Sequence, residues 1–206
     1  HYKTEEPNFF GFEPMSGPDC LVDIACSNAG TIVSEDEKTV TFNSDAFVEA
    51  MESARKWINE EKIMGIHFGG DGWEYWYKTI DDVMQGRAGG YIGSSGDQGD
   101  LDFDIIAAHV QPGFNDNPPK PYVDPITAAI VKKAPDVEKQ AAFQFLTYLN
   151  KVGTKNFSMS AGYVPVRSSV KEDEEYKVYL EKNPQALVPI EQAELGRRKW
   201  HDITGG

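Results

Sequence analysis

The most chemically useful polar groups of this chain lie in the loop 93–97, with the sequence Gly-Ser-Ser-Gly-Asp. The loop follows an apolar run that is typical of a short buried strand, and loops at strand ends often carry binding groups because the scaffold fixes them. Ser94, Ser95 and Asp97 are therefore candidate ligand-binding residues. Ser95 also resembles a hydrolase nucleophile, but Asp97 stands where that motif has its closing glycine, so a serine hydrolase is not predicted.

Metal-binding patterns begin in this sequence but are not completed. Asp100, Asp102 and Asp104 start like a calcium loop, but Ile105 stands where the loop needs glycine and Gln111 where it needs a bidentate glutamate. A strand whose solvated face carries the aspartates is the simpler interpretation. The 4 histidines are scattered, without zinc-ligand spacing, and no phosphate-binding loop is present. We expect no metal and no cofactor.

Several aromatic side chains lie next to turns and polar groups. They are Trp73 at a predicted helix start, Tyr122 close to Asp124, and Tyr163 in a turn. Flat rings beside carboxylates and hydroxyls suit sugars or polyols, because sugar C–H faces stack on rings while hydroxyl groups take hydrogen bonds. Core packing is the alternative, and Trp73 fits both interpretations. These residues join the candidate site for a polyhydroxylated solute.

The loop must be positioned by the helix and strand that precede it. Trp73, Trp76, Tyr77 and the following apolar residues recur at helical spacing over 73–84, which predicts one buried stripe. Trp76 and Tyr77 lie on that stripe, so core packing is favoured for them. Gly86 is suited to a left-handed C-cap, and residues 88–92 then predict a short buried strand that leads into the loop.

The remaining elements are predicted from periodicity and breakers. Residues before Gly17 look irregular because three prolines exclude a long helix, and an amphipathic helix starts at Asp45 after an N-cap cluster. The predicted elements are a short turn or helix over 20–26, a hairpin over 31–33 and 39–42, a strand over 100–108, an extended segment over 111–121, a turn and strand over 122–131, helices over 135–149 and 154–160, and a charged helix over 170–200 interrupted at Pro184 and Pro189.

Composition indicates an acidic globular protein of one or two domains. Of its 206 residues, 40% are hydrophobic and 12% aromatic, which is sufficient for a sizeable core. The net charge of -13 and the absence of a basic cluster argue against a nucleic-acid partner. No run approaches the roughly 18 apolar residues of a membrane span, and residues 1–7 lack the apolar region of a signal peptide. The chain is therefore expected to be mature, truncated or cytosolic.

Cys20 and Cys26 are the two cysteines. If the intervening segment is helical, six positions separate them by roughly 9 Å, which exceeds the roughly 7 Å that a disulfide tolerates between Cα atoms. We expect two buried thiols rather than a bridge, which leaves the redox compartment open.

Five sequence blocks in a fixed order resemble a known family. They are Asn28-Ala29-Gly30, the helix from Asp45, Val83-Met84-Gln85-Gly86-Arg87-Ala88-Gly89, Ala141-Ala142-Phe143-Gln144-Phe145-Leu146, and Gly162-Tyr163-Val164-Pro165-Val166-Arg167. Together the blocks resemble the extracellular solute-binding proteins of ABC importers, within the carbohydrate-binding group that includes maltose- and glycerol-phosphate-binding proteins. The last block is the most specific, because it follows a helix with the Ala-Ala-x-x-Phe-Leu pattern.

The resemblance implies an α/β fold, the second lobe of a type II periplasmic-binding-protein architecture, with a mixed sheet flanked by helices. In this family two lobes enclose the ligand, and here the first lobe and its lipoprotein or signal segment are missing. Residues 1–110 would form the core of the C-terminal lobe, 111–153 would cross to the missing N-terminal lobe, and 154–206 would return. The ligand-facing segments would be 94–97 and 17–19, which adds Asp19, while the return through 162–167 near the hinge adds Arg167.

The function implied by the resemblance is capture of a sugar or other polyhydroxylated solute for an ABC permease, without catalysis. The location would be periplasmic or extracellular, with membrane association through the missing N-terminus of the parent protein, and the missing lobe or a second chain would cover residues 122–149. Because no tryptophan directly follows the strand at Ile92, hydrogen bonding to a polar ligand is favoured there over stacking. The alternative is a glycan-active hydrolase domain in which Asp97 and a second carboxylate act as acid and base.

Overall fold

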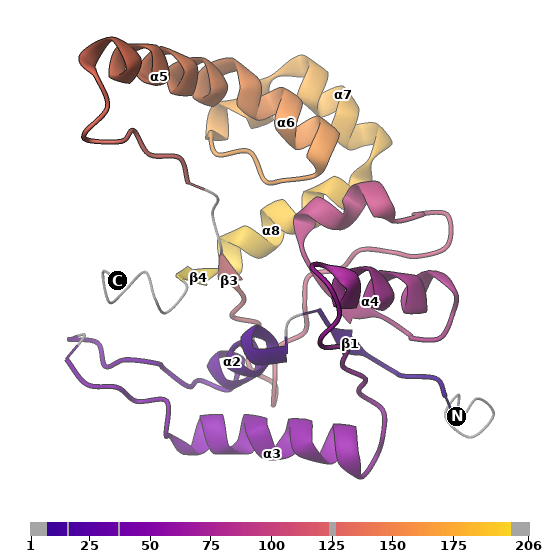
Figure 1. The fold of residues 1–206 in the computed structure, drawn as a ribbon. Helices are drawn as coiled ribbons and strands as arrows, with labels where there is room; N and C mark the ends of the chain where they lie inside the picture. Colours follow the sequence, from indigo (N-terminus) through magenta and orange to yellow (C-terminus); the bar gives the residue numbers. More distant parts are fainter. Residues whose placement is uncertain (1–7, 16, 37, 124–126, 199–206) are drawn as a thin grey trace.

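The structure, a computed structural model, describes residues 8–15, 17–36, 38–123 and 127–198. Its elements run in the order β1 (Glu13–Pro14), α2 (Gly17–Ser27), α3 (Asp45–Asn59), α4 (Glu74–Met84), β2 (Tyr91–Ile92), η1 (Ser95–Asp100), β3 (Tyr122–Val123), α5 (Asp136–Tyr148), η2 (Leu149–Gly153), α6 (Thr154–Ala161), η3 (Ser168–Glu172), α7 (Glu174–Lys182), η4 (Pro184–Leu187), α8 (Val188–Leu195) and β4 (Arg197–Arg198). Figure 1 shows their arrangement. No helix within these ranges has the length and apolar character to cross a membrane.

The centre of the first part is a small parallel sheet with β1 in the middle. β1 pairs with β2, and single parallel bridges extend the contact to Phe10 with Ala88 on one side and Phe12 with Met64 on the other. Residues 10–14, which lie in a segment that the sequence predicts to be irregular, thus form the middle strand. The prediction was wrong because the prolines were taken to exclude regular structure. A proline removes only one backbone N–H donor, which a strand this short can tolerate.

Pro14 fits this central strand because of where its missing N–H would point. Glu13 and Met15 donate backbone hydrogen bonds to the β2 side, at 3.0 and 2.9 Å. Phe12 donates instead to Ile63 on the opposite side, so alternation directs position 14 to that side as well. Pro14 therefore ends the pairing with residues 63–65 without breaking the pairing with β2.

Helices cover both faces of the sheet, in the order expected for an α/β lobe. Figure 1 shows α2 and α3 on one side of β1 and α4 on the other. Phe12, Cys20, Ala54, Met64 and Trp57 pack together between the sheet and the α2–α3 pair. A neighbouring cluster of Ala25, Cys26, Phe47 and Ala50 joins α2 directly to α3. The α/β class predicted from the sequence is confirmed, although both two-residue strand pairs are parallel rather than mixed.

The C-terminal helices form a second packed group. Val170, Tyr176 and Ile190 make its core, which joins η3, α7 and α8. After α8, β4 pairs in parallel with β3, so the end of the described chain returns beside the segment that leaves the first group (Figure 1). Pro184 and Pro189 lie at the starts of η4 and α8, which confirms the predicted interruptions.

The helix predictions agree closely with the structure. The helices predicted from Asp45 and over 73–84, 135–149 and 154–160 appear as α3, α4, α5 and α6. Gly86 has φ +71°, the left-handed value expected at its C-cap position. Residues 20–26 belong to α2, and Cys20 and Cys26 are both buried without a disulfide, which confirms that prediction.

Three strand predictions are wrong or too long. Residues 100–108 form no strand, because the Asp102 side chain accepts a hydrogen bond from the Asp104 N–H at 2.9 Å and its carbonyl accepts one from Ile105, which bends the chain. The predicted hairpin is reduced to one antiparallel bridge between Val33 and Val40. A turn and strand are predicted over 122–131. Of the described residues in this range, 122–123 and 127–131, only Tyr122 and Val123 form a strand, β3.

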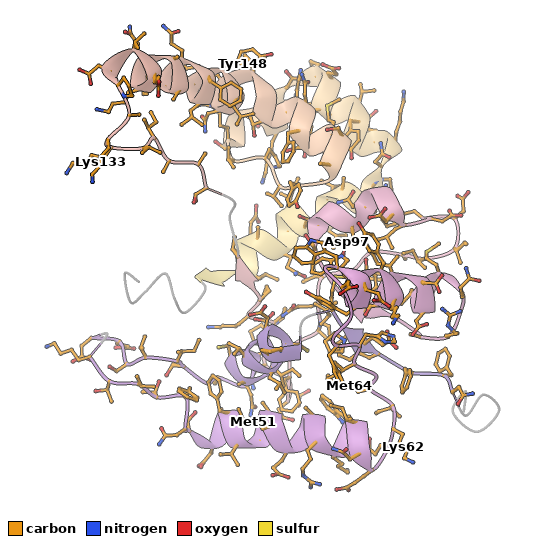
Figure 2. All side chains as sticks on the ribbon, viewed as in Figure 1. Met51, Lys62, Met64, Asp97, Lys133 and Tyr148 are labelled. Carbon is orange, nitrogen blue, oxygen red and sulfur yellow. The ribbon has the colours of Figure 1, made fainter. Side chains whose placement is uncertain are left out.

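Helix α5 stands apart from the rest of the fold. It buries none of its residues, and Figure 1 shows it projecting beyond α6. Phe145 is 62% exposed and Leu149 is 39% exposed. Tyr148, labelled at the end of α5 in Figure 2, is also exposed. The described structure therefore leaves an apolar helix face uncovered.

Candidate functional site

The candidate site lies at the edge of the sheet where its parallel strands end. The chain leaves β1 into α2, leaves the segment 63–66 toward the start of α4, and leaves β2 into η1. Because the paired strands run in the same direction, these three exits lie along one edge. In open α/β sheets, ligands bind outside the carboxyl ends of the strands. This edge holds Asp19 in the first turn of α2, Trp73 at the start of α4, and Ser94, Ser95 and Asp97 around η1.

Asp97 organises this edge through hydrogen bonds to three elements. Its Oδ1 accepts from Trp76 Nε1 of α4 at 2.9 Å. Its Oδ2 accepts from the Ser94 N–H at 2.9 Å and from the Tyr91 hydroxyl at 3.2 Å. The Ser94 hydroxyl accepts from Gly96 N–H, which completes a capping box at the start of η1. Figure 2 shows Asp97 beside α4.

The electrostatic environment of Asp97 reflects its burial. Only 4% of the residue is exposed. Burial raises its pKa, while its hydrogen bonds from Ser94, Trp76 and Tyr91 act in the opposite direction. Burial and the nearby Asp97 charge also raise the pKa of the Tyr91 hydroxyl, which therefore stays protonated at neutral pH and donates a hydrogen bond to Asp97. Both carboxylate oxygens of Asp97 are thus engaged in holding the loop.

Tyr163 meets the same loop from the C-terminal group. A Cβ built on Gly96 would lie 2.8 Å from the Tyr163 hydroxyl, so the ring packs directly on the glycine. The other side of the Tyr163 ring is stacked on Phe157, with centroids 5.3 Å apart and planes at 5°. Gly162, with φ +77°, lets the turn approach the Ser95 carbonyl, which would lie 2.5 Å from an added Cβ. Ser95 and Tyr163 are therefore brought together.

Trp73 is positioned but left open to solvent. Its ring makes an edge contact with Trp76, at a centroid distance of 5.6 Å, and a tilted contact with Tyr75. The residue is 64% exposed, so most of it remains available. Of the two interpretations of Trp73, the structure disfavours core packing.

The other predicted site residues lie elsewhere or beyond description. Arg167 is exposed and donates to the Asn150 side chain at 3.1 Å. Tyr122 lies in β3, in a strand pair separate from this edge, and its side chain is outside the description. Asp124 is outside the described residues. Among the described residues, the structure therefore gives no contact between Arg167 or strand β3 and the edge that holds Trp73 and Asp97.

Two functional contributors were missed by the sequence reasoning. Trp76 was expected in the core, and Tyr91 was treated as part of a strand without a role of its own. Both instead donate to Asp97. Their side chains could have been suspected, because a buried indole N–H or phenol needs a polar partner and Asp97 is the carboxylate nearest in sequence to Tyr91.

A small hollow lies beside this edge, between η1, α6 and the turn into η4. Its volume is about 170 Å³, and it is lined by Gln98, Gly99, Met159, Ser160, Gly162, Tyr179, Asn183 and Gln185. Typical small-molecule sites are about 300 to 1,000 Å³, so this hollow by itself would not enclose an oligosaccharide. The edge can supply aromatic contact and hydrogen bonds from one side.

Comparisons with known proteins agree on the kind of protein that carries this arrangement. A model of the bacterial extracellular solute-binding protein family matches residues 18–186. Similar solved structures include UgpB from Mycobacterium tuberculosis in complex with glycerophosphocholine, with a TM-score of 0.71 and 18% identity. They also include the maltose/maltodextrin-binding domain MalE from Bdellovibrio bacteriovorus bound to maltotriose, with a TM-score of 0.67 and 18% identity.

These structural matches cover nearly all of this chain but half of the larger proteins. The match to UgpB covers 93% of this chain and 48% of that chain, and the match to MalE covers 93% and 49%. At this identity the likeness establishes the fold, that of a lobe of type II periplasmic binding proteins. No curated protein sequence matches this chain significantly.

Proposed function

The chain belongs to the bacterial extracellular solute-binding proteins, and from this we propose that it is part of the substrate-binding component of an ABC importer. The observation that carries the proposal is the family match over residues 18–186, together with the aromatic and polar edge described above. The family and its structural relatives are binding proteins rather than enzymes. We therefore propose a role in solute capture without catalysis.

The solute we propose is a sugar or another polyhydroxylated compound. The similar structures are bound to maltotriose in one case and glycerophosphocholine in another, and both ligands carry hydroxyl groups. Trp73 offers an exposed ring beside the half-buried Trp76, which suits stacking on a C–H face. Ser94, Ser95 and Asp19 lie along the same edge and offer hydrogen bonds.

Asp97 supports the site in this proposal rather than acting on the solute. Both of its oxygens accept hydrogen bonds from the protein, and it is buried. A glycosidase would need it to face a second carboxylate across the substrate, with about 5 to 10 Å between the two. Incubation with an oligosaccharide panel tests this alternative: turnover that is lost in Asp97→Asn would contradict a binding role.

The assignment of residue ranges to the two lobes is also a proposal. We assign residues 1–110 to the core of a C-terminal lobe, 111–153 to a segment that crosses to an N-terminal lobe, and 154–206 to the return. The packing of η1 on Tyr163 supports the return. The Lys120 N–H donates to Ser27 Oγ at 2.9 Å, and Phe114 contacts Trp57. Residues 111–120 therefore still pack on the C-terminal lobe, and the proposed crossing to the N-terminal lobe begins after Pro121.

The wider setting follows from the family. Its members are extracellular, so the proposed location is periplasmic or extracellular, and the proposed partner is an ABC permease. Membrane association through an N-terminal part of the parent protein is a further proposal. The uncovered face of α5, with Phe145 and Leu149 exposed, supports the proposal that an N-terminal lobe or a second chain packs there.

Titration followed by NMR tests solute binding in the 206-residue chain. One wall of a two-walled site should bind weakly, so we expect a Kd in the millimolar range, about -4 kcal/mol, for maltotriose or glycerophosphocholine. The indole N–H signal of Trp73 should shift on titration while that of Trp57, which packs on Phe114, stays in place. Shifts of neither indole, or equal shifts of both, would contradict the proposed site.

A Trp73→Ala variant tests the contribution of this ring, and Tyr77→Ala is its matched control. Loss of a stacked ring should weaken binding by about 1 to 3 kcal/mol, roughly fivefold to 150-fold. Ser95→Ala should cost less, because one hydrogen bond is worth about 1 kcal/mol. Tyr77→Ala removes a comparably exposed ring from the same helix and should leave the affinity unchanged. Unchanged affinity in Trp73→Ala would remove Trp73 from the site.

A further inference from the structure

A second cluster of ligand-type side chains lies under α4, apart from the candidate solute site. Glu13 of β1, His67 after the segment 63–66, and Asp82 of α4 place their ligand atoms within 4.8 Å of one another. His67 Nε2 lies 2.8 Å from Asp82 Oδ2 and 3.5 Å from Glu13 Oε2. The cluster could not be predicted from local sequence patterns, because 54 positions separate Glu13 from His67.

Glu13 is the unusual member of this cluster. Its side chain is 0% exposed, and neither carboxylate oxygen has a hydrogen-bond partner among the described residues. A buried carboxylate without partners is costly, because burial removes water without replacing its hydrogen bonds. Its Oε2 lies 3.5 Å from His67 Nε2, and its ligand atom is within 4.8 Å of those of His67 and Asp82, so the buried carboxylate faces the other two side chains.

Neighbouring contacts orient the other two side chains. Arg87 Nε donates to Asp82 Oδ1 at 2.6 Å, and its guanidinium also pairs with Asp81. That fork fixes the Asp82 carboxylate and leaves Oδ2 directed at His67. Together with these neighbours, the cluster brings the carboxyl groups of Glu13, Asp81 and Asp82 around one guanidinium. The His67 side chain is 30% exposed, which gives a path from solvent to the centre.

We propose that Glu13, His67 and Asp82 form a divalent-cation site, with Zn²⁺ as the best-suited ion. One imidazole nitrogen and two carboxylate oxygens are ordinary zinc ligands, and three protein ligands leave one position for water. Ligand atoms about 2.0 to 2.1 Å from zinc in a tetrahedron lie about 3.3 Å apart. The two separations from His67 are 2.8 and 3.5 Å, and all three ligand atoms lie within 4.8 Å of one another, so small side-chain shifts would bring them to this geometry. A Zn²⁺ ion would satisfy the Glu13 oxygens and offset the local negative charge.

The role inferred for this ion is structural. It would join β1, the chain after 63–66 and α4, and so fix α4 against the sheet whose edge carries Trp73. The inference stands independently of solute binding, since Trp73, Ser95 and Asp97 are not among the proposed ligands. Failure of the solute proposal would not affect it.

Calorimetry with Zn²⁺ on the chelator-treated 206-residue chain tests the proposal. We expect one Zn²⁺ per chain, and a loss of affinity of at least about tenfold to a hundredfold in both Glu13→Gln and His67→Gln. His109→Gln is the control, because His109 is exposed and is not part of the cluster. Absence of Zn²⁺ binding by the wild-type chain, or equal binding by all three variants, would overturn the proposal.

Thermal unfolding separates metal binding from general destabilisation. Without metal, Glu13→Gln should unfold at the same temperature as wild type or higher, because it removes a buried carboxylate whose oxygens lack hydrogen-bond partners. With Zn²⁺ the wild-type Tm should rise while that of Glu13→Gln should not. Co²⁺ in place of Zn²⁺ should give the visible absorption of a tetrahedral site, which both ligand variants lose. A Zn²⁺ shift that persists in Glu13→Gln would contradict the assignment.

Discussion

Trp76 donates its indole N–H to Asp97 across 2.9 Å, and this bond joins the helix before β2 to the loop after it. The two residues lie 21 positions apart, with the whole of β2 between them. Tyr91, in β2 itself, donates to the same carboxylate. Helix, strand and loop are therefore clamped at one buried charge. These hydrogen bonds therefore fix the position of the residues that the loop carries.

Asp97→Asn should destabilise the fold although it preserves shape. The amide offers one accepting oxygen and a donating NH₂, which would face the N–H or O–H of the present donors. We expect the free energy of unfolding to fall by about 2 to 3 kcal/mol, the usual cost of lost bonds to a buried charged group. Asp100→Asn, at an exposed position, should change it by less than about 0.5 kcal/mol. Urea unfolding measures both, and equal effects would contradict the clamp.

Gly162 and Gly86 form a matched pair for testing the close approach between α6 and η1. Both have left-handed φ values, +77° and +71°, but an added Cβ at Gly86 meets nothing within 4 Å whereas at Gly162 it meets the Ser95 carbonyl at 2.5 Å. Gly86→Ala should cost about 1 to 2 kcal/mol for its backbone conformation. Gly162→Ala should cost about 1 to 3 kcal/mol more from overpacking. Equal costs in urea unfolding would show that α6 and η1 are not held this closely.

Cys20 should resist thiol reagents in the folded protein. Burial, followed by the nearby Asp23 and Asp19, raises the pKa of its thiol to about 12. The thiolate is the reactive form, so labelling at pH 8 should be roughly a thousandfold slower than in unfolded protein. A Cys26→Ala variant isolates Cys20, and mass spectrometry of iodoacetamide adducts with and without urea gives the two rates. Rapid labelling of the folded variant would contradict this packing.

The exposed face of α5 should make the 206-residue chain self-associate. Phe145 and Leu149 would be buried at such a contact, because exposed apolar surface favours association. We expect sedimentation velocity to show a concentration-dependent increase in mass, reduced in a Phe145→Ser, Leu149→Ser double variant. Val166→Ser alters an equally exposed apolar residue outside α5 and is the control. A wild-type chain that stays monomeric at high concentration would argue that this face needs no cover.

The helices of this fold could be read from the sequence because their signals are local. The apolar spacing in α3 and α4 and the left-handed Gly86 depend on residues within a few turns of one another. The middle strand β1 was missed because its evidence is distant: its partners lie near residues 64 and 91. The aspartates of 100–108 imitate a strand pattern, but Asp102 uses its side chain to form a turn.

The candidate site was predictable as a region but not in its roles. The loop 93–97 and Trp73 were named from the sequence as candidate site residues, and the structure places both at one edge, since strand exits and helix starts follow from local patterns. The inward orientation of Asp97 was not predictable, because it depends on donors from Trp76 and Tyr91. The burial of Glu13 was equally hidden, since sequence alone placed it in an irregular segment.

The parallel pairings of this fold have a consequence for the order in which it forms. β1 pairs with β2 across about 78 residues and β3 with β4 across about 75, and closing a loop of that size costs about 4 kcal/mol of chain entropy. The α2–α3 pair closes a much shorter loop and can form while the chain is still being synthesised. Tyr122 and Val123, by contrast, must wait for Arg197 and Arg198. The pairing of β3 with β4 therefore forms later than the α2–α3 contact. Until it forms, the helices between β3 and β4 are connected along the chain to the first packed group only through β3.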